Sequence, residues 1–264
     1  MEKKKYKTVV LSDIHLGSPS SRAKEATEFL KYIECDNLIL NGDIIDGWAL
    51  RKGFKWSKDH TRFVRRVLKM TYSESINVVY LRGNHDDFLD KLLPISIPGI
   101  KICKEYVYES FGNKYYIIHG DVFDLITTKF KFISKLGGLA YDFLIWLNRR
   151  YNKWRVKRGK EEYSLSKAVK SKVKAAVNFV SDFENVLSVY TESRGYDAVI
   201  CGHIHHPEIK KINNTLYLNS GDWVENLTAL VETHEGEWKI VYYSEIEKEI
   251  YENTIPVPAG PGAG

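Results

Sequence analysis

Short runs of aliphatic and β-branched residues recur along the first half of the chain and return near its end. Five of these runs are each followed directly by a polar segment. They are residues 8–11, 38–40, 78–81, 115–118 and 198–201. Runs of this length and composition are typical of strands that are buried on both faces of an α/β sheet. The sequence therefore predicts a buried sheet with polar loops at the ends of its strands.

Helical spacing of apolar residues fills the intervals between the first runs. Residues 22–33 show this spacing, and Ser57 is a candidate N-cap for a second helix that ends near Tyr72. Alternation of strands and helices favours stacked βα units around a sheet.

Two later regions favour antiparallel strands. Residues 106–111 and 114–119 are predicted to form a hairpin closed by Gly112 and Asn113. Strand signals return from residue 197 to residue 243, with turns at 213–214 and 235–236.

The strand signals disappear between residues 125 and 194. Apolar residues recur there at spacings of three and four, which predicts an amphipathic helix that ends in the basic stretch 149–160. A second, lysine-rich helix is predicted after Ser164. We interpret residues 125–194 as a helical insertion, or lid, in a core formed by residues 1–124 and 195–250. Residues 251–264 are predicted to be a disordered tail.

Composition narrows the class of protein. A chain of 264 residues forms one large domain or one domain with an insertion. The net charge of +5 does not by itself indicate a nucleic-acid partner. The three cysteines are widely spaced and are expected to be free thiols in a reducing compartment. No signal peptide or membrane-spanning stretch is evident, so we expect a cytoplasmic protein.

The polar segments after the five runs contain the residue types that bind metal ions. Five of the eight histidines lie in them. The segments are Asp13-Ile14-His15, Gly42-Asp43, Gly83-Asn84-His85-Asp86, His119-Gly120-Asp121 and Gly202-His203-Ile204-His205. Ligands of open α/β sheets bind beyond the carboxyl ends of the strands, so these side chains are expected to meet there. The sequence predicts a metal centre.

Two of the segments each contain a pair of candidate ligands separated by one residue. Asp13-x-His15 and His203-x-His205 are expected to be extended, which would place both side chains of each pair on one face. Any one segment alone is explained as well by capping aspartates and hydrogen-bonded loop histidines. Five segments in series, each after a strand, favour the metal centre. Mixed carboxylate, amide and imidazole ligands suit manganese, iron or zinc.

In this order the five motifs resemble those of the calcineurin-like metallophosphoesterases. The resemblance implies a four-layer α/β/β/α sandwich and two divalent metal ions, with Mn²⁺ favoured. It assigns one ion to Asp13, His15, Asp43 and His205, and the other ion to Asp43, Asn84, His119 and His203.

The resemblance also implies a mechanism. A hydroxide that bridges the two ions attacks phosphorus, as expected for a two-metal hydrolase. His85 faces the leaving oxygen, and Asp46 orients His85. The alternative for Asp46 is a simple loop cap.

Within this superfamily, residues 12–18, 41–48, 178–184, 201–207 and 218–223 resemble the bacterial UDP-2,3-diacylglucosamine diphosphatase group. Enzymes of that group cleave a nucleotide-linked lipid to UMP and 2,3-diacylglucosamine 1-phosphate in lipid A synthesis. The well-studied branch of the group has arginine at the position of His85, so another lipid or nucleotide phosphoester stays open as the substrate. A non-enzymatic scaffold is disfavoured because no ligand position is substituted.

The insertion has two interpretations for each of its features. Its apolar stripe forms an acyl-chain groove or packs on the core, and its basic stretch contacts an anionic membrane surface or is simply solvated. No nucleic-acid partner is predicted, because that basic stretch lies beside an apolar stripe rather than among stacking aromatics. The candidate substrate contacts are Lys167, Lys170, Lys174 and Trp223.

Overall fold

A computed structural model describes residues 3–91, 93, 96–123 and 180–254. The chain divides into two compact units, one formed by Met1–Asp121 with Ser188–Gly264 and the other by Val122–Leu187. Most of the predicted insertion, with Lys167, Lys170 and Lys174, lies outside the described residues. Within the described part, no helix has the length and apolarity needed to cross a membrane.

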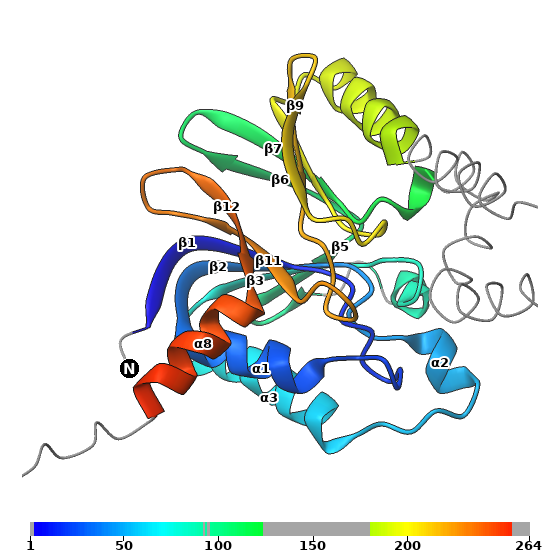
Figure 1. Cartoon of the computed structure of the whole chain (residues 1–264). Helices are drawn as coiled ribbons and strands as arrows, with labels where there is room; N and C mark the ends of the chain where they lie inside the picture. The colour runs from blue at the N-terminus through cyan, green and yellow to red at the C-terminus, as the bar shows by residue number, and fades with distance from the viewer. Residues whose placement is uncertain (1–2, 92, 94–95, 124–179, 255–264) are drawn as a thin grey trace, which may run out of the picture. The chain divides into compact units, whose positions relative to one another are not determined.

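The first unit contains two β-sheets that face each other (Figure 1). In sheet order, the seven-stranded sheet consists of β12 (Trp238–Tyr242), β11 (Thr228–Glu232), β1 (Lys4–Leu11), β2 (Ile33–Asn41), β3 (Asn77–Leu81), β5 (Ile100–Cys103) and β4 (Ser96–Ile97). The five-stranded sheet consists of β6 (Glu105–Ser110), β7 (Asn113–Ile118), β8 (Ala198–Cys201), β10 (Thr215–Asn219) and β9 (Glu208–Ile212). The central strands of both sheets are parallel, and antiparallel strands flank them.

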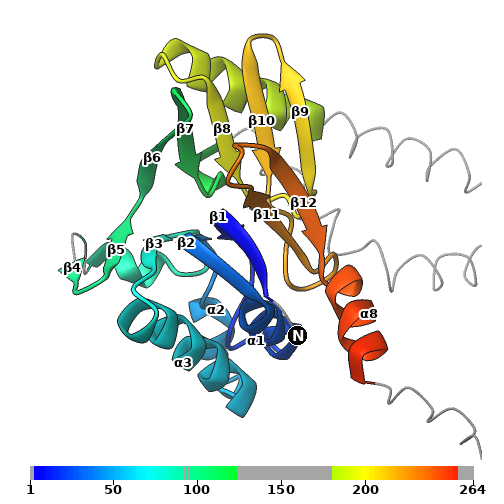
Figure 2. The same cartoon turned by 90° about the vertical axis from the view of Figure 1, so that its left-hand side faces the viewer.

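Helices cover the outer faces of the two sheets, as Figure 2 shows. Three helices pack on the seven-stranded sheet: α1 (Ala23–Tyr32), α3 (Lys58–Ser73) and α8 (Tyr243–Thr254). Residues 188–193 of a further helix pack on the five-stranded sheet, where the Tyr190 ring lies 5.9 Å from that of Tyr116. The described residues of the unit also form two short helical turns, α2 (Gly47–Arg51) and η1 (Asp87–Lys91), and η2 begins at Asp121 and ends at Phe123. This order of layers confirms the predicted α/β/β/α sandwich.

Alternating side chains of the central strands fill two separate cores. Val9 and Leu11 of β1 pack under the helices, whereas Val10 packs between the sheets. The next strand repeats the pattern with Leu38 on the helix side and Ile39 between the sheets. Because both faces are covered, these strands have no polar face, and this explains the uninterrupted apolar runs.

Most of the predicted elements are confirmed, with differences at their ends. The five predicted strands and the two helices predicted near residues 22–33 and 57–72 are present, whereas the two helices predicted in the insertion lie mostly outside the described residues. Ser57 caps α3 by accepting a hydrogen bond from the His60 N–H. The hairpin turn is formed by Phe111 and Gly112, one residue earlier than predicted, since Ser110 pairs with Asn113. Helix α8 was not predicted, and it continues to Thr254, so the predicted start of the tail at residue 251 lies inside a helix.

Candidate metal centre

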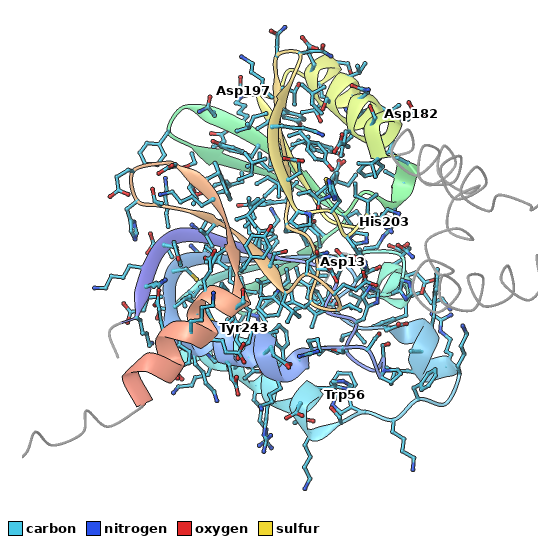
Figure 3. The ribbon with its side chains drawn as sticks, in the orientation of Figure 1. Asp13, Trp56, Asp182, Asp197, His203 and Tyr243 are labelled. Atoms are coloured by element: carbon cyan, nitrogen blue, oxygen red, sulfur yellow. The ribbon has the colours of Figure 1, made fainter. Side chains whose placement is uncertain are left out.

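The predicted ligands lie in loops at the carboxyl ends of five strands. The strand pattern alone suggested a single sheet, whereas the strands belong to two, as the predicted sandwich requires: β1, β2 and β3 in one, β7 and β8 in the other. The two sheets meet at this edge, where Asp13 and His203 lie close together (Figure 3). The His203 N–H donates to Asp13 Oδ2 at 3.0 Å, which ties the β1 loop to the β8 loop.

Histidine nitrogens converge on two buried carboxylates. The Nε2 atom of His205 lies 3.2 Å from Asp13 Oδ1, and that of His119 lies 3.4 Å from Asp43 Oδ2. The His15 Nε2 atom lies 3.9 Å from an oxygen of each carboxylate. Ligands about 2.1 Å from a shared ion are about 3 to 4 Å apart, so these separations suit metal binding.

Among the described residues, the candidate ligand atoms fall into three overlapping groups, each with all of its atoms within 4.8 Å of one another. The groups are Asp13 with His15 and His205, His15 with Asp43 and His85, and Asp43 with His119 and His203. His15 and Asp43 each occur in two groups, so the groups form one continuous cluster.

Three buried polar atoms of the predicted ligands have no hydrogen-bond partner among the described residues. They are Asp13 Oδ1, Asn84 Oδ1 and His119 Nε2. A buried polar group without a partner costs about 1–3 kcal/mol. All three belong to predicted ligands, and a divalent cation would satisfy each of them. The donor set therefore fits the predicted metal.

The backbone at the ligands is unusual. Nine non-glycine residues in the described part of the chain have positive φ, and five of them are predicted ligands: Asp13, His15, Asp43, His203 and His205. The expectation that Asp13-x-His15 and His203-x-His205 are extended is therefore wrong. Both strands end before the ligands, and left-handed residues then turn the side chains inward. Such conformations persist where the surroundings hold them, and they are frequent at functional sites.

Neighbouring groups fix the orientation of His119. Its Nδ1 atom lies 2.9 Å from the Asn41 carbonyl oxygen, so Nδ1 carries the proton and Nε2 is left for a metal. The ring packs against the backbone of Gly42 and Gly83, where a Cβ atom would collide with it. Glycine is required at these positions because the ligands approach the chain so closely.

Asp86 connects two of the loops that carry predicted ligands. Its Oδ2 atom accepts hydrogen bonds from the Ile44 N–H at 3.1 Å and from the Tyr80 hydroxyl at 2.7 Å, and its Oδ1 atom accepts the Gly83 N–H. Burial, followed by the nearby charge of Asp43, raises the pKa of Asp86. The aspartate thus positions the loops and does not face the ligand cluster.

Asp46 contacts two histidines and also caps a helix. Its Oδ1 atom lies 2.9 Å from Nδ1 of His85, and its Oδ2 atom lies 3.5 Å from Nδ1 of His15. The same Oδ1 atom accepts the Ala49 N–H at the start of α2, so the loop-cap interpretation also describes this residue. Burial would raise the pKa of Asp46, but its hydrogen bonds to the two histidines lower it.

His85 is held in position by two aromatic rings and by a backbone hydrogen bond. Its ring lies 4.2 Å from the Trp48 ring and meets the His15 ring edge-on at 4.6 Å. Its backbone N–H donates to Asp43 Oδ1 at 2.8 Å. With Nδ1 directed to Asp46, the Nε2 atom faces the cluster, 4.0 Å from Asp43 Oδ2.

The electrostatics favour cation binding. Burial would raise the pKa of Asp13 and Asp43, but the surrounding histidines outweigh it and lower both pKa values. Burial would likewise lower the pKa of His205, but Asp13 and then Asp222 raise it to about 9. Carboxylates that stay ionised at neutral pH and attract positive charge are what a divalent ion requires.

Comparison with known proteins agrees with this geometry. Residues 6–207 match the model of the calcineurin-like phosphoesterase family. The chain belongs to that family. The protein is therefore a metal-dependent hydrolase, and the cluster described above is its candidate metal centre.

Relatives of this phosphoesterase are distant. A UDP-2,3-diacylglucosamine hydrolase from Shewanella frigidimarina is 23% identical over 235 residues, which is 87% of this chain and 94% of the relative. The hydrolase of the same name from Yersinia pseudotuberculosis is 22% identical, over 78% of this chain and 84% of its own length. A solved archaeal phosphodiesterase is 15% identical, with a TM-score of 0.44 over 89% of this chain and 98% of that one.

Trp223 does not have the position expected of a substrate contact in the phosphoesterase. The prediction is wrong for its side chain, which is fully buried and packs against the rings of Phe29 at 5.4 Å and Tyr243 at 6.2 Å. Its backbone N–H donates to the Asp13 carbonyl oxygen at 3.1 Å. Trp223 thus supports the Asp13 loop from the core.

Sequence reasoning missed Asp222, which supports another ligand of the phosphoesterase. Asp222 is fully buried, and its Oδ2 atom lies 3.8 Å from Nδ1 of His205. Its carboxylate also accepts the Asn226 N–H, and the Asn226 side chain donates to the His205 carbonyl oxygen at 2.9 Å. The available signal was the Gly-Asp pair after β10, which repeats the Gly42-Asp43 pair after β2.

Proposed function

We propose that this phosphoesterase hydrolyses UDP-2,3-diacylglucosamine to UMP and 2,3-diacylglucosamine 1-phosphate, a step of lipid A synthesis. The main support is the convergence of histidine Nε2 atoms on Asp13 and Asp43 beside the His85–Asp46 pair. The names of the two hydrolase relatives support the substrate. A phosphodiesterase or phosphatase for another lipid or nucleotide is the second candidate, because His85 replaces the arginine of the well-studied branch.

We further propose that the centre holds two divalent ions, with Mn²⁺ the favoured metal and iron or zinc the alternatives. The first ion takes Asp13, His15, Asp43 and His205. The second takes Asp43, Asn84, His119 and His203. Asp43 belongs to both sets because its carboxylate reaches ligands of both. Bound ions of this kind lower the pKa of a coordinated water and neutralise phosphoryl oxygens.

The protein's own groups would assist the leaving oxygen. Asp46 accepts the Nδ1 proton of His85, so a proton on Nε2 of that ring is directed toward the cluster. We propose that His85 donates this proton, or a hydrogen bond, to the phosphate oxygen that leaves. The contact of Trp48 with the His85 ring restricts its rotation and keeps the donor in place.

The proposed lipid substrate also indicates where the enzyme works. A diacylated substrate resides in a membrane, so we propose a cytoplasmic enzyme that contacts the anionic inner membrane surface peripherally. Lys167, Lys170 and Lys174 stay candidates for contacts with the nucleotide phosphates.

The substrate is tested by incubating the purified protein with Mn²⁺ and UDP-2,3-diacylglucosamine. Release of UMP and the lipid phosphate is expected, and Asp43→Asn, which removes the shared ligand charge, should abolish it. A parallel panel contains bis-p-nitrophenyl phosphate, p-nitrophenyl phosphate and nucleoside diphosphates. Turnover within this panel, without release of UMP from the lipid, would overturn the proposed substrate and favour the second candidate.

The two-ion proposal is tested by metal analysis of the protein and its variants. About two ions per chain are expected. His205→Ala and His119→Ala should each lower the content by about one, since they belong to different sets, whereas Asp43→Asn should lose both. A content of one ion that only one of the two histidine substitutions removes would contradict the dinuclear assignment.

A further inference from the structure

An exposed loop that connects α2 to α3 combines aromatic and basic side chains. We define the aromatic–basic loop as residues 52–58, and every one of them is exposed. Phe54 is 48% exposed and Trp56 is 40% exposed. Large apolar side chains that are close together on a surface mark sites of interaction more often than isolated ones do.

The charges of the loop lack compensation. The guanidinium of Arg51, just before the loop, pairs with Asp87 at 2.7 Å. The ammonium groups of Lys52, Lys55 and Lys58 form no ion pair with any residue that the structure describes. Three cations without an ion pair among the described residues therefore alternate along the loop with two exposed aromatic rings.

The loop is held in place by the helix that follows it. The Trp56 indole N–H donates to the Thr61 hydroxyl at 2.9 Å, and its ring meets the His60 ring edge-on at 5.2 Å. Ser57 caps α3. Because these contacts fix the backbone around Trp56, little conformational entropy is lost when a partner binds.

A cavity of about 380 Å³ opens beside Phe54, between the aromatic–basic loop and the loop that follows the first metal ligands. Its lining residues include Lys24 and Lys55 together with Ser18, Ser21 and Ser57. The two acidic residues of the lining are already paired, Glu25 with Arg22 and Asp59 with Arg62. Positive charge therefore prevails in the cavity, which suits the phosphate of a headgroup.

We propose that the aromatic–basic loop binds the surface of an anionic phospholipid membrane, with Phe54 and Trp56 entering the interface and the lysines facing headgroup phosphates. Aromatic rings favour the membrane–water interface, and each cation near an anionic surface contributes about 1 kcal/mol. Single-stranded nucleic acid is the competing partner, but it requires a groove that follows the backbone, with several stacking rings.

The loop follows directly on α2, whose N-cap is Asp46, the residue that contacts His85 and His15 of the candidate centre. Binding there would bring a lipid-linked substrate to the centre. The biological purpose of membrane binding rests on the proposed hydrolysis of a lipid-linked substrate. Membrane binding itself is measured without any hydrolysis.

The test measures co-sedimentation of the full chain with vesicles. Wild type should bind vesicles of equal parts phosphatidylcholine and phosphatidylglycerol, and should bind them more weakly as salt is added. Pure phosphatidylcholine vesicles should retain far less protein. Lys→Gln substitutions at positions 52, 55 and 58 should lower the partition coefficient about fivefold each, which corresponds to about 1 kcal/mol per charge. The double variant Phe54→Ser with Trp56→Ser should also lose binding.

Matched controls are available elsewhere on the surface. Lys31→Gln, Lys69→Gln and Lys211→Gln remove the same charge from exposed sites, and Tyr72→Ser removes an exposed ring; all four should bind as wild type does. Hydrolysis of bis-p-nitrophenyl phosphate should be unchanged in the loop variants, which verifies that they are folded.

Three outcomes would overturn the proposal: loop variants that bind vesicles as tightly as wild type, wild type that does not prefer anionic vesicles, or loop variants that lose single-stranded DNA binding but keep vesicle binding. If anionic vesicles bind through the loop while UDP-2,3-diacylglucosamine is not hydrolysed, the membrane contact stands and only the proposed substrate fails.

Discussion

Among the single residues of the centre, Asp46 links the candidate metal site to the candidate leaving-group side. One of its oxygens serves His85 and the N-terminus of α2, and the other faces His15. The orientation of a predicted ligand and that of the proposed proton donor therefore depend on the same carboxylate. A substitution of Asp46 would disturb both, so it cannot separate the two roles.

The substitution His85→Ala separates the proposed role of proton donor from metal binding. We expect kcat to fall by about 10² to 10⁴, the usual contribution of a positioned acid, because the leaving oxygen loses its donor. Metal content should stay close to that of wild type, because the seven proposed ligands are all retained. Steady-state kinetics and metal analysis of the same preparation measure both quantities.

The neighbouring His206 provides the control for this substitution. His206 is 52% exposed, and its nearest acidic group is Glu208 at 3.8 Å. His206→Ala should therefore keep both turnover and metal. Full activity in His85→Ala would refute the role assigned to His85, and loss of metal in that variant would return His85 to the ligand set.

At the scale of elements, Arg66 joins two helices through a buried guanidinium. It donates to the Leu30 carbonyl oxygen near the end of α1 and to the carboxylate of Glu74, the C-cap of α3. Glu74→Gln removes the negative partner and leaves a buried cation with weaker compensation. We expect the free energy of unfolding to fall by about 1–2 kcal/mol, as measured by urea denaturation at pH 7.

The pH dependence of this loss distinguishes an ion pair from simple packing. The hydrogen bond from Arg66 lowers the pKa of Glu74 in the folded protein. The stabilisation is therefore complete above the ordinary glutamic acid pKa of about 4.3 and disappears as the pH falls below it. Wild type and Glu74→Gln should differ at pH 7 and converge at acid pH. A difference that does not change with pH would point to packing instead.

The elements that were predicted from sequence are those whose pattern has a single structural explanation. The runs that became β1, β2, β3, β7 and β8 are apolar on both faces because both faces are covered. Helix α2 is too short to show a period, and α8 follows β12 with no turn residue to separate them. The division into two sheets was implied only by the resemblance, and the order of strands within each sheet was not predicted, since it depends on pairings between distant segments such as β1 with β11.

At the scale of the whole molecule, the metal centre depends on two sheets that end at the same edge. The ligand residues themselves could be predicted, because each follows a recognisable strand. The left-handed backbone of five of them and the support from Asn41 and Asp222 could not be predicted, because the contacts that impose them join segments far apart in the chain. The relative placement of the two sheets therefore determines the geometry of the centre.

A buried network of hydrogen bonds connects the two sheets and fixes their relative placement. Glu232 of β11 is fully buried and accepts hydrogen bonds from the Tyr108 hydroxyl at 2.6 Å and the Ser110 hydroxyl at 2.5 Å, both on β6 in the other sheet. Lys7 donates to Ser110 at 2.7 Å, and Thr8 shares a hydrogen bond with Tyr108. Because β11 runs antiparallel to β1, this network lies at the edge opposite the metal centre.

Tyr108→Phe tests this network with little change in volume. We expect the free energy of unfolding to fall by about 1–3 kcal/mol, because one oxygen of a buried carboxylate loses its donor. Turnover should be unchanged, since no ligand loop is touched. Urea denaturation and a kinetic assay of the same sample provide the two measurements.

The difference in the free energy of unfolding between wild type and Tyr108→Phe should depend on pH in a defined direction. Burial, and then the hydrogen bond to Glu232, raises the pKa of Tyr108 to about 12. A pKa raised above the ordinary tyrosine value of about 10 stabilises the fold below that value and ceases to do so as the pH rises toward 12. The advantage of wild type over Tyr108→Phe should thus be constant from neutral pH to about pH 9 and shrink above pH 10. If Tyr108→Phe were as stable as wild type at neutral pH, or impaired turnover, the network would not be an independent link between the sheets.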